Sequence, residues 1–386
     1  MSGLKLRKAL IAAKIETTEG VDAAPGTNDC LIVANLKPSP MKVKTESRDI
    51  VRPFLGNSEQ LVTAVNSALG MDAELAGSGT AGVAPRIGRL LRMCGFAELV
   101  LAAALTGTAA AGAASSITLA AGASASDDAY KNLEIRIVSG PAAGDVRLIT
   151  GYNGTTKVAT VATPFSATPT TSTNYSLDPQ VSYAPISDGM ESGTLVYNMD
   201  GTESRLRSAR GDWSLKMASG GRPMFSMNFQ GLFTAINDAA PLVPTYANQA
   251  TPLPVNFQNT PFFAVHGYAA KLRELSIACG NVVTYRNLVN QEGIELPDRK
   301  MSGNVIMEAV KVATHDFWEP ARVAGTGTLE MTHGTVAGNI VRILSNRMQL
   351  IPPDGYTDED GIAMVNWGAA FIPTTLGNDE LVIIFK

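Results

Sequence analysis

The chain has 386 residues, of which 45% are hydrophobic and 17% are charged, and its formal net charge is −4. This length exceeds what one ordinary domain needs, so we expect two or three domains. The acidic balance argues against a nucleic-acid-binding protein, which would show a basic patch. The three cysteines (Cys30, Cys94 and Cys279) are odd in number and far apart, so neither a disulfide framework nor a zinc site is expected.

Neither of two apolar stretches predicts a membrane segment. The apolar run from Ala9 to Ala13 is ended by Lys14 and Glu16, so it is too short for a secretory signal. Residues 99–126 carry no charge, but they are mostly Ala, Gly, Ser and Thr, which makes a poor membrane span. We therefore expect no membrane partner.

The first predicted elements are a strand and a short helix. Residues 61–75 alternate apolar and polar side chains with a period of two, which is typical of a half-buried strand. Residues 85–96 place apolar side chains at helical spacing, with Gly95 as the C′ glycine, and predict an amphipathic helix. Its other side carries Arg86, Arg89 and Arg92, which form either a solvated face or a surface for carboxylates of a neighbouring subunit.

A small β module is predicted in the middle of the chain. Residues 101–126 are rich in Ala, Gly, Ser and Thr and predict a linker or a loosely packed excursion. Three strand-like runs follow at 133–138, 145–152 and 157–163, and Asn-Gly at 153–154 is a strong hairpin signal. Residues 101–180 are therefore interpreted as an all-β module inserted into a larger domain.

Beyond the module the chain repeats the plan of its first half. Residues 193–233 read as strands and hairpins, and residues 327–371 parallel them, with a short helix predicted at 314–323 before the second set. The sequence NFQGLF at 228–233 is echoed by NWGAAF at 366–371. We interpret this as a duplication.

Two segments complete the second half. Residues 339–350 (NIVRILSNRMQL) are compatible with a strand or a helix, and LVIIF at 381–385 predicts a closing strand.

The fold class follows from these elements as mainly β. We expect two tandem domains built of strands and hairpins, each with a short helix, plus the small inserted module. The first domain is discontinuous, at 1–100 and 181–250; the module is 101–180; the second domain is 251–386.

One glycine motif suggests a nucleotide. Gly77, Gly79 and Gly82 spell G-x-G-x-x-G before the predicted helix. The dinucleotide fingerprint needs a parallel βαβ unit, whereas the preceding strand alternates as antiparallel strands do. A hinge is favoured over a nucleotide-binding enzyme, and no cofactor is expected.

Other residue types that carry chemistry form no recognisable site, and we assign no catalytic, cofactor-binding or metal residues. The three histidines are isolated, and an Arg-Gly-Asp tripeptide falls within a predicted hairpin. The acidic runs lack calcium-loop spacing, and the second run is interpreted as a solvated loop. These residues are His266, His315, His333, Asp127–Asp128, Asp358–Glu359–Asp360 and Arg210–Asp212.

Several segments together resemble the major tail proteins of long-tailed, non-contractile bacteriophages. They are KALIAAKIETTEGVDAAPGTND (8–29), residues 31–60, the strand and helix within 61–96, and the close GYTDEDGIAMVNWGAAFIPTTLGNDELVIIFK (355–386). The inserted module resembles β modules that recur in phage virion proteins. The alternatives are another virion protein, such as a capsid decoration or tail-fibre protein, and less plausibly a nucleotide-binding enzyme.

The resemblance implies that each of the two domains is an antiparallel β-sandwich or barrel flanked by a helix. It also implies a virion protein, assembled in the host cytoplasm, whose stacked rings form the tail tube for DNA delivery. Family rings are commonly sixfold, so a duplicated subunit would form trimers with pseudo-sixfold symmetry. Residues 36–60 and 284–303 would be arms reaching another subunit or ring. Tape-measure, tail-tip and tail-terminator proteins would be partners, and DNA would pass through the lumen without specific binding.

We also expect a polar, neutral to acidic channel lining. The side chains that motivate this expectation lie on alternating strand faces: Asn66, Asp72, Glu74, Asn304 and Glu308.

Overall fold

The computed structural model describes residues 3–375 and 377–386, and the fold is mainly β, as the sequence predicts. The elements before the module are β1 (Ala9–Ile15), the 3-10 helix η1 (Thr27–Asp29), β2 (Cys30–Leu31), β3 (Val33–Ser47), β4 (Gln60–Glu74), α1 (Gly88–Met93) and β5 (Phe96–Leu101). Those of the module are β6 (Leu105–Thr108), β7 (Ala111–Ala113), β8 (Ser116–Thr118), β9 (Glu134–Ser139), β10 (Val146–Asn153), β11 (Val158–Val161) and β12 (Asn174–Leu177).

The remaining elements run from the module to the C-terminus. The first of them are β13 (Gln180–Pro185), β14 (Gly193–Met199), β15 (Thr202–Ala218), β16 (Met224–Phe233), β17 (Asn237–Asp238), β18 (Phe262–Val265), β19 (Leu272–Ala278), β20 (Thr284–Leu288), β21 (Gln291–Glu295) and β22 (Ser302–Glu308). The last are α2 (Trp318–Arg322), β23 (Thr326–His333), β24 (Val341–Ile351), β25 (Tyr356–Glu359), β26 (Ile362–Phe371) and β27 (Val382–Phe385).

Eight strands form one continuous antiparallel sheet in the order β25-β26-β22-β19-β15-β16-β4-β3. One face of this eight-stranded sheet is in the main core, where Met71, Trp213, Phe229, Val305 and Trp367 are buried. The other face is polar. The two-residue period of β4 predicted this division, because successive side chains of a strand point to opposite faces.

A second layer covers the buried face of the eight-stranded sheet. It contains β1 and β14 on one side, and β18, β23, β24, β27, β13 and β5 on the other. Side chains of this layer, such as Ile11, Leu195 and Ile343, belong to the same buried cluster as those of the eight-stranded sheet. The helix α1 packs against β1 and β5.

The two halves of the chain share one strand order. The first half pairs its strands as β1-β14-β15-β16-β4-β3, and the second as β18-β23-β24-β26-β22-β19. Among the six strands of each order, a short helix lies between the third and the fourth along the chain. Asn228 is the fifth residue of β16, and Asn366 is the fifth of β26, so the NFQGLF and NWGAAF echoes occupy the same place.

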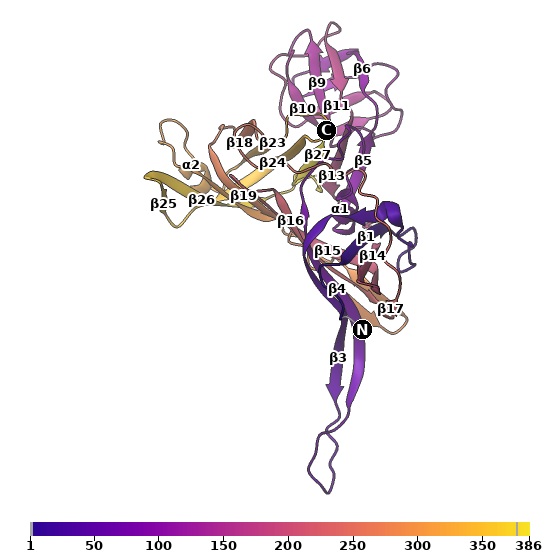
Figure 1. The fold of residues 1–386 in the computed structure, drawn as a ribbon. Coiled ribbons are helices and arrows are strands. Elements are labelled where there is room, and N and C mark those ends of the chain that lie inside the picture. The colour runs from indigo at the N-terminus through magenta and orange to yellow at the C-terminus, as the bar shows by residue number, and fades with distance from the viewer. Residues whose placement is uncertain (1–2, 376) are drawn as a thin grey trace.

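The module forms a separate seven-stranded sheet with its own buried cluster, which includes Ile117 and Leu119. It lies at the opposite end of the molecule from the β3–β4 hairpin (Figure 1). The chain enters and leaves it through paired strands, since Leu101 of β5 lies opposite Gln180 of β13. The prediction that 101–126 is a linker is wrong, because β6, β7 and β8 lie there. The strands predicted at 133–138, 145–152 and 157–163 are present as β9, β10 and β11.

Two further sequence predictions are corrected or decided. The predicted helix 85–96 is shorter, at Gly88–Met93, although Gly95 has the expected positive φ of 78°. Residues 339–350 contain the strand β24, not a helix. The cysteines are free and buried. Within residues 3–375 and 377–386 no helix is long and apolar enough to cross a membrane.

Candidate functional site

The eight-stranded sheet is open at both edges. Among the described residues, β3 pairs only with β4, and β25 pairs only with β26. Both outer edges are solvent-exposed over most of their length. An unpaired strand edge presents backbone donors and acceptors that can pair with another chain. The two edges are therefore the first candidate surfaces for assembly.

Inside the chain, one strand contact joins the two halves within this sheet. Ser214–Ala218 at the end of β15 pairs antiparallel with Glu274–Ala278 of β19. On the buried face of this joint, Leu215 lies opposite Ile277, and both are almost fully buried. On the polar face, the Lys216 ammonium lies 3.0 Å from the Glu274 carboxylate. We refer to this β15–β19 contact as the internal joint.

The polar face of the sheet carries charges of both signs, and most of them are paired. Glu308 contacts Lys271 at 2.6 Å and raises the pKa of that lysine through a hydrogen bond. The Asp72 carboxylate accepts a hydrogen bond of 2.6 Å from Asn35. The other pairs are Arg273–Glu359 at 2.6 Å and Arg222–Glu74. Among the described residues, Lys37 and Lys42 on β3 make no ion pair.

A family model described as phage tail tube protein matches residues 7–371 of the chain. The chain belongs to this family. It is a structural protein of the virion tail, as the resemblance of its segments predicted. A search of the curated proteins finds no match to the sequence.

The longest projection of this tail tube protein is the hairpin of β3 and β4, with a loop at 48–59 (Figure 1). Its tip exposes apolar side chains: Val51 and Leu55 are fully exposed, and Phe54 is 65% exposed. Exposed apolar groups that gather on one loop mark a surface for another protein. The sequence prediction of an arm at 36–60 falls on this hairpin. The second predicted arm, at 284–303, contains the short β20–β21 hairpin.

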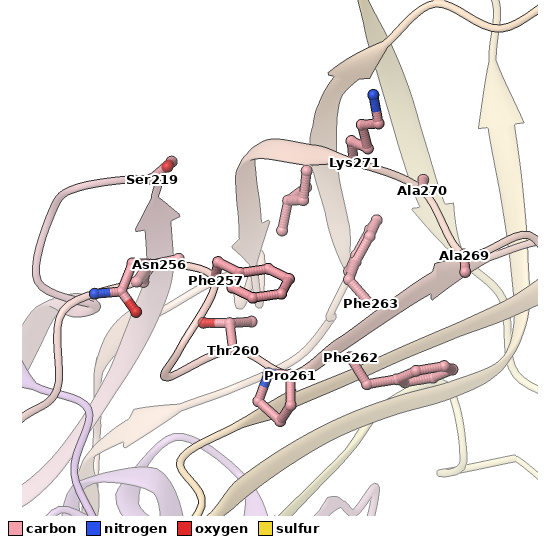
Figure 2. A pocket seen from close by; sticks show the side chains of 12 residues that line it. Ser219, Asn256, Phe257, Thr260, Pro261, Phe262, Phe263, Ala269, Ala270 and Lys271 are labelled. Carbon is pink, nitrogen blue, oxygen red and sulfur yellow. The ribbon is translucent and has the colours of Figure 1, made fainter.

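A pocket of about 420 Å³ lies at the edge of the second half, beside β18 and the start of β19. Figure 2 shows Phe257, Phe262 and Phe263 around it, with Lys271 at one side. Phe257 is 96% exposed, so its ring stands in solvent instead of closing the pocket. This mixed apolar surface is suited to a side chain of another protein, as many interface pockets are.

The glycine motif has a packing role in the tail tube protein. Gly79 N–H donates to the Gly338 carbonyl at 2.9 Å, and Gly77 N–H donates to Asn339 Oδ1 at 2.9 Å. A Cβ at Gly77 would lie 2.0 Å from the Gly338 carbonyl oxygen. The loop therefore needs glycine to approach the second half closely. The nucleotide interpretation lacks its structural context, because β4 pairs antiparallel with both of its neighbours.

The arginines on the helix are paired within the chain. Arg89 contacts Asp29 at 2.7 Å, and Arg92 contacts Glu191 at 2.6 Å. Arg86 donates from Nε to a backbone carbonyl at 2.9 Å. The alternative in which these arginines bind carboxylates of a neighbouring subunit is wrong for Arg89 and Arg92, because both form ion pairs within the chain.

The histidines do not form one site. His333 hydrogen-bonds Thr260 and the Leu253 carbonyl, and burial lowers its pKa. The His266 ring is hydrogen-bonded to a different group, the Met348 carbonyl, and burial lowers the pKa of His266 as well.

The acidic run Asp127–Asp128 stabilises a hairpin, and the run Asp358–Asp360 begins on the edge strand β25. Asp127 and Asp128 accept hydrogen bonds from backbone N–H groups of the β10–β11 hairpin region. Asp358 and Glu359 belong to β25, and Asp360 begins the turn into β26. The interpretation of this second run as a solvated loop is wrong, because two of its residues pair with β26. No group of three or more metal-ligating side chains is found in the described part of the chain.

The Arg-Gly-Asp tripeptide lies inside β15, as its strand-rich surroundings predicted. Arg210 is buried and contacts Glu19 at 2.7 Å. Burial raises the pKa of Asp212.

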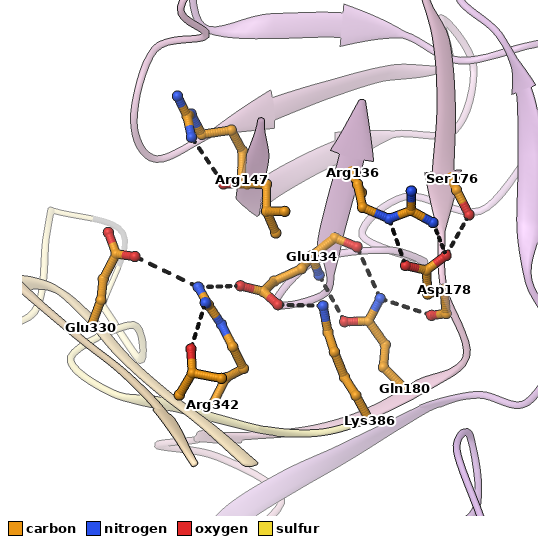
Figure 3. Close-up of polar contacts among 11 residues, drawn as sticks. Glu134, Arg136, Arg147, Ser176, Asp178, Gln180, Glu330, Arg342 and Lys386 are labelled. Carbon is orange, nitrogen blue, oxygen red and sulfur yellow. Dashed lines mark hydrogen bonds and ion pairs between the residues drawn. The ribbon is translucent and has the colours of Figure 1, made fainter. Parts of the chain in front are cut away.

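A buried ion cluster connects the module to β24 and to the C-terminal residue Lys386 (Figure 3). The Glu134 side chain is 1% exposed and contacts Arg342 of β24 at 2.7 Å and Lys386 at 2.5 Å. Gln180 bonds both backbone groups of Glu134, donating to its carbonyl and accepting from its N–H at 2.9 Å. Sequence reasoning missed this cluster, because its members are far apart along the chain.

Proposed function

We propose that this tail tube protein polymerises as stacked rings into the tube of a long-tailed, non-contractile phage, and that DNA is delivered through the tube. The observation that carries the proposal is the eight-stranded sheet, which is open at both edges and already contains one joint between equivalent halves. A joint that occurs once within the chain can be repeated between chains, because each half offers the same strands in the same order.

Repetition of the internal joint gives a closed ring. β24 and β25 together pair along β26 as β15 pairs along β16, so β25 corresponds to the end of β15. The β3 edge of one copy takes the place of β19, and the β25 edge of the next copy takes the place of that end of β15. Both outer edges of the eight-stranded sheet are then paired, which removes the aggregation hazard of these open edges. We propose that residues 1–100 and 181–250 form one tube unit, that 251–386 form a second, and that 101–180 are an insert. Three chains then supply six units with pseudo-sixfold symmetry.

The polar face of the sheet would line the lumen. It bears Asp72, Glu74, Glu274 and Glu308, and their carboxylates are hydrogen-bonded or paired to cations of the same face. Free lysines and arginines would neutralise phosphates and hold DNA in a salt-dependent way. Most charges of this lining are paired, with the lysines of β3 as exceptions, so passing DNA would meet few free cations.

The β3–β4 arm would reach the adjacent ring. Its tip exposes the apolar side chains of Val51, Phe54 and Leu55. Their apolar surface is removed from water only when the tip packs on another protein. Stacked rings supply that protein, and the tape-measure, tail-tip and tail-terminator proteins would bind at the inside and the ends of the tube. Assembly would take place in the host cytoplasm.

Electron microscopy of the purified protein tests the proposal. The expected result is rings or tubes with threefold symmetry, six similar inner lobes and three outer protrusions. Only monomers, or trimeric spikes without a central hole, would overturn it and favour another virion protein. The variant Val51→Ser/Leu55→Ser should still form rings but stack them poorly, and Val138→Ser, at an exposed site on the module, is the matched control.

A further inference from the structure

The strand registers place two residues of the second half in the positions of two charged residues of the first half. Lys216 pairs with Met224, the first residue of β16, and Glu359 pairs with Ile362, the first residue of β26. Lys216 and Glu359 are therefore equivalent, since β16 and β26 are both ten residues long and occupy the same place in the strand order.

The same argument relates Lys37 to Glu274. Gly70 and Ile306 are equivalent, because they pair with Asn228 and Asn366 at the fifth position of those two strands. Lys37 pairs with Gly70 on β3, and Glu274 pairs with Ile306 on β19. Lys37 and Glu274 thus occupy corresponding positions on corresponding strands.

Both charges are reversed between the halves. At the internal joint the lysine is on β15 and the glutamate on β19, 3.0 Å apart. At the free edges the glutamate is on β25, as Glu359, and the lysine is on β3, as Lys37. We propose that Glu359 of one copy pairs with Lys37 of the next, so that the joint between chains is a charge-reversed copy of the internal joint. This inference rests on the proposed ring.

The reversal also decides which edges can meet. Two β3 edges would bring Lys37, Lys42 and Lys44 against the same lysines, and two β25 edges would bring Asp358 and Glu359 against themselves. Like charges across an interface suppress the wrong pairing. Association through two-fold contacts is disfavoured, and head-to-tail contact of β3 with β25 is favoured. A head-to-tail contact closes a ring when its rotation allows.

The state of both edges agrees with this role. Arg273 donates to Oε1 of Glu359 at 2.6 Å, so Oε2 can accept from a second cation. Both side chains of that pair are 41% exposed. On β3, Pro38 and Pro40 have no backbone N–H, so the edge offers fewer donors for a strand ladder. Side-chain charges therefore carry more of the specificity of this joint than of the internal one.

Charge-swap variants test the inference in the full-length protein. Glu359→Lys sets a lysine against Lys37, and Lys37→Glu sets a glutamate against Glu359, so each should lower the association constant of the joint about tenfold or more. The double variant Lys37→Glu/Glu359→Lys restores opposite charges and should recover ring formation. Asp188→Lys and Lys131→Glu, away from both edges, are the matched controls, and circular dichroism checks that each monomer is folded.

Mass photometry and negative-stain microscopy give the outcomes. Failure of the wild-type protein to form rings would contradict the proposed function. Wild-type rings together with equally good assembly of both single variants would overturn the charge pairing alone. Failure of the folded double variant to assemble would also overturn it, since opposite charges would then not suffice. Loss in both single variants with recovery in the double variant supports the pairing.

Discussion

Gly77 in the first half packs directly against Gly338 in the second half. A Cβ at Gly77 would lie 2.0 Å from the Gly338 carbonyl oxygen, and the neighbouring Gly79 N–H donates to that same oxygen. The contact fixes the loop before α1 onto the loop between β23 and β24. The two halves are therefore held together by backbone packing as well as by the internal joint.

Gly77→Ala should destabilise the protein by about 1–3 kcal/mol, because a side chain there must push backbone apart. Thermal unfolding of the variant measures the loss. Gly56→Ala in the arm is the control, since no atom lies within 4 Å of its added Cβ. Equal melting temperatures for the two variants would contradict the packing role.

Deletion of residues 105–178 with a short Gly/Ser bridge should leave ring formation intact. Leu101 and Gln180 lie opposite each other on paired strands, so a short bridge closes the gap without strain. Long surface insertions add little entropic cost, and their removal is tolerated for the same reason. Microscopy should show rings without the outer protrusions. A soluble, folded deletion variant that forms no rings would contradict this.

Glu134→Gln should destabilise the protein by about 3–5 kcal/mol, because it leaves the cations of Arg342 and Lys386 without their buried partner. Chemical denaturation measures this change. Glu319→Gln, which breaks the exposed pair with Arg322, should change stability little. Equal losses in the two variants would contradict the role of burial in the Glu134 cluster.

Stability should fall as the pH drops below about 6.5, the usual pKa of a free histidine. Burial lowers the pKa of His333 in the folded state, so the unfolded chain binds the proton more readily between the two pKa values. Each unit of depression corresponds to about 1.4 kcal/mol. His333→Gln should flatten the fall in melting temperature between about pH 7 and pH 5, and substitution of His266 should flatten it further. An unchanged slope in both variants would show that other groups control it.

Much of the fold could be predicted from local patterns. The alternation in 61–75 identified β4 and its buried face, and the Asn-Gly signal identified the β10–β11 hairpin. The strands within residues 101–126 could not be predicted from the local pattern, because their small residues pack against large side chains that are distant in the sequence. A Cβ at Gly107 would lie 2.7 Å from the hydroxyl oxygen of Tyr175, so glycine is required there by a distant neighbour. The alternation of apolar and polar residues that indicates a strand is absent from such a segment, which shows only a low-complexity composition.

The assembly surfaces were less accessible from sequence. Lys37 and Glu359 are in conspicuous charged runs, but their correspondence to Glu274 and Lys216 depends on the registers of several strand pairs. Bulges in β3 shift that register, so counting residues along the sequence does not give it. The echo of NFQGLF in NWGAAF is a local signal from which the alignment could start.

A mixture of the two single charge variants should associate without forming threefold rings. In the mixture, Lys37 of a Glu359→Lys chain pairs with Glu359 of a Lys37→Glu chain. At the other edges of these chains, the glutamate introduced at position 37 pairs with the lysine introduced at position 359. Opposite charges therefore require the two variants to alternate. Alternation closes a ring only when the number of chains is even, whereas the curvature of a three-chain ring is fixed by the internal joint. Mass photometry should show open chains in which the two variants alternate, beginning with mixed dimers, and the double variant alone should give trimers. Closed rings from the mixture, as abundant as those of the wild-type protein, would show that the ring contains an even number of chains and that the threefold assembly is wrong.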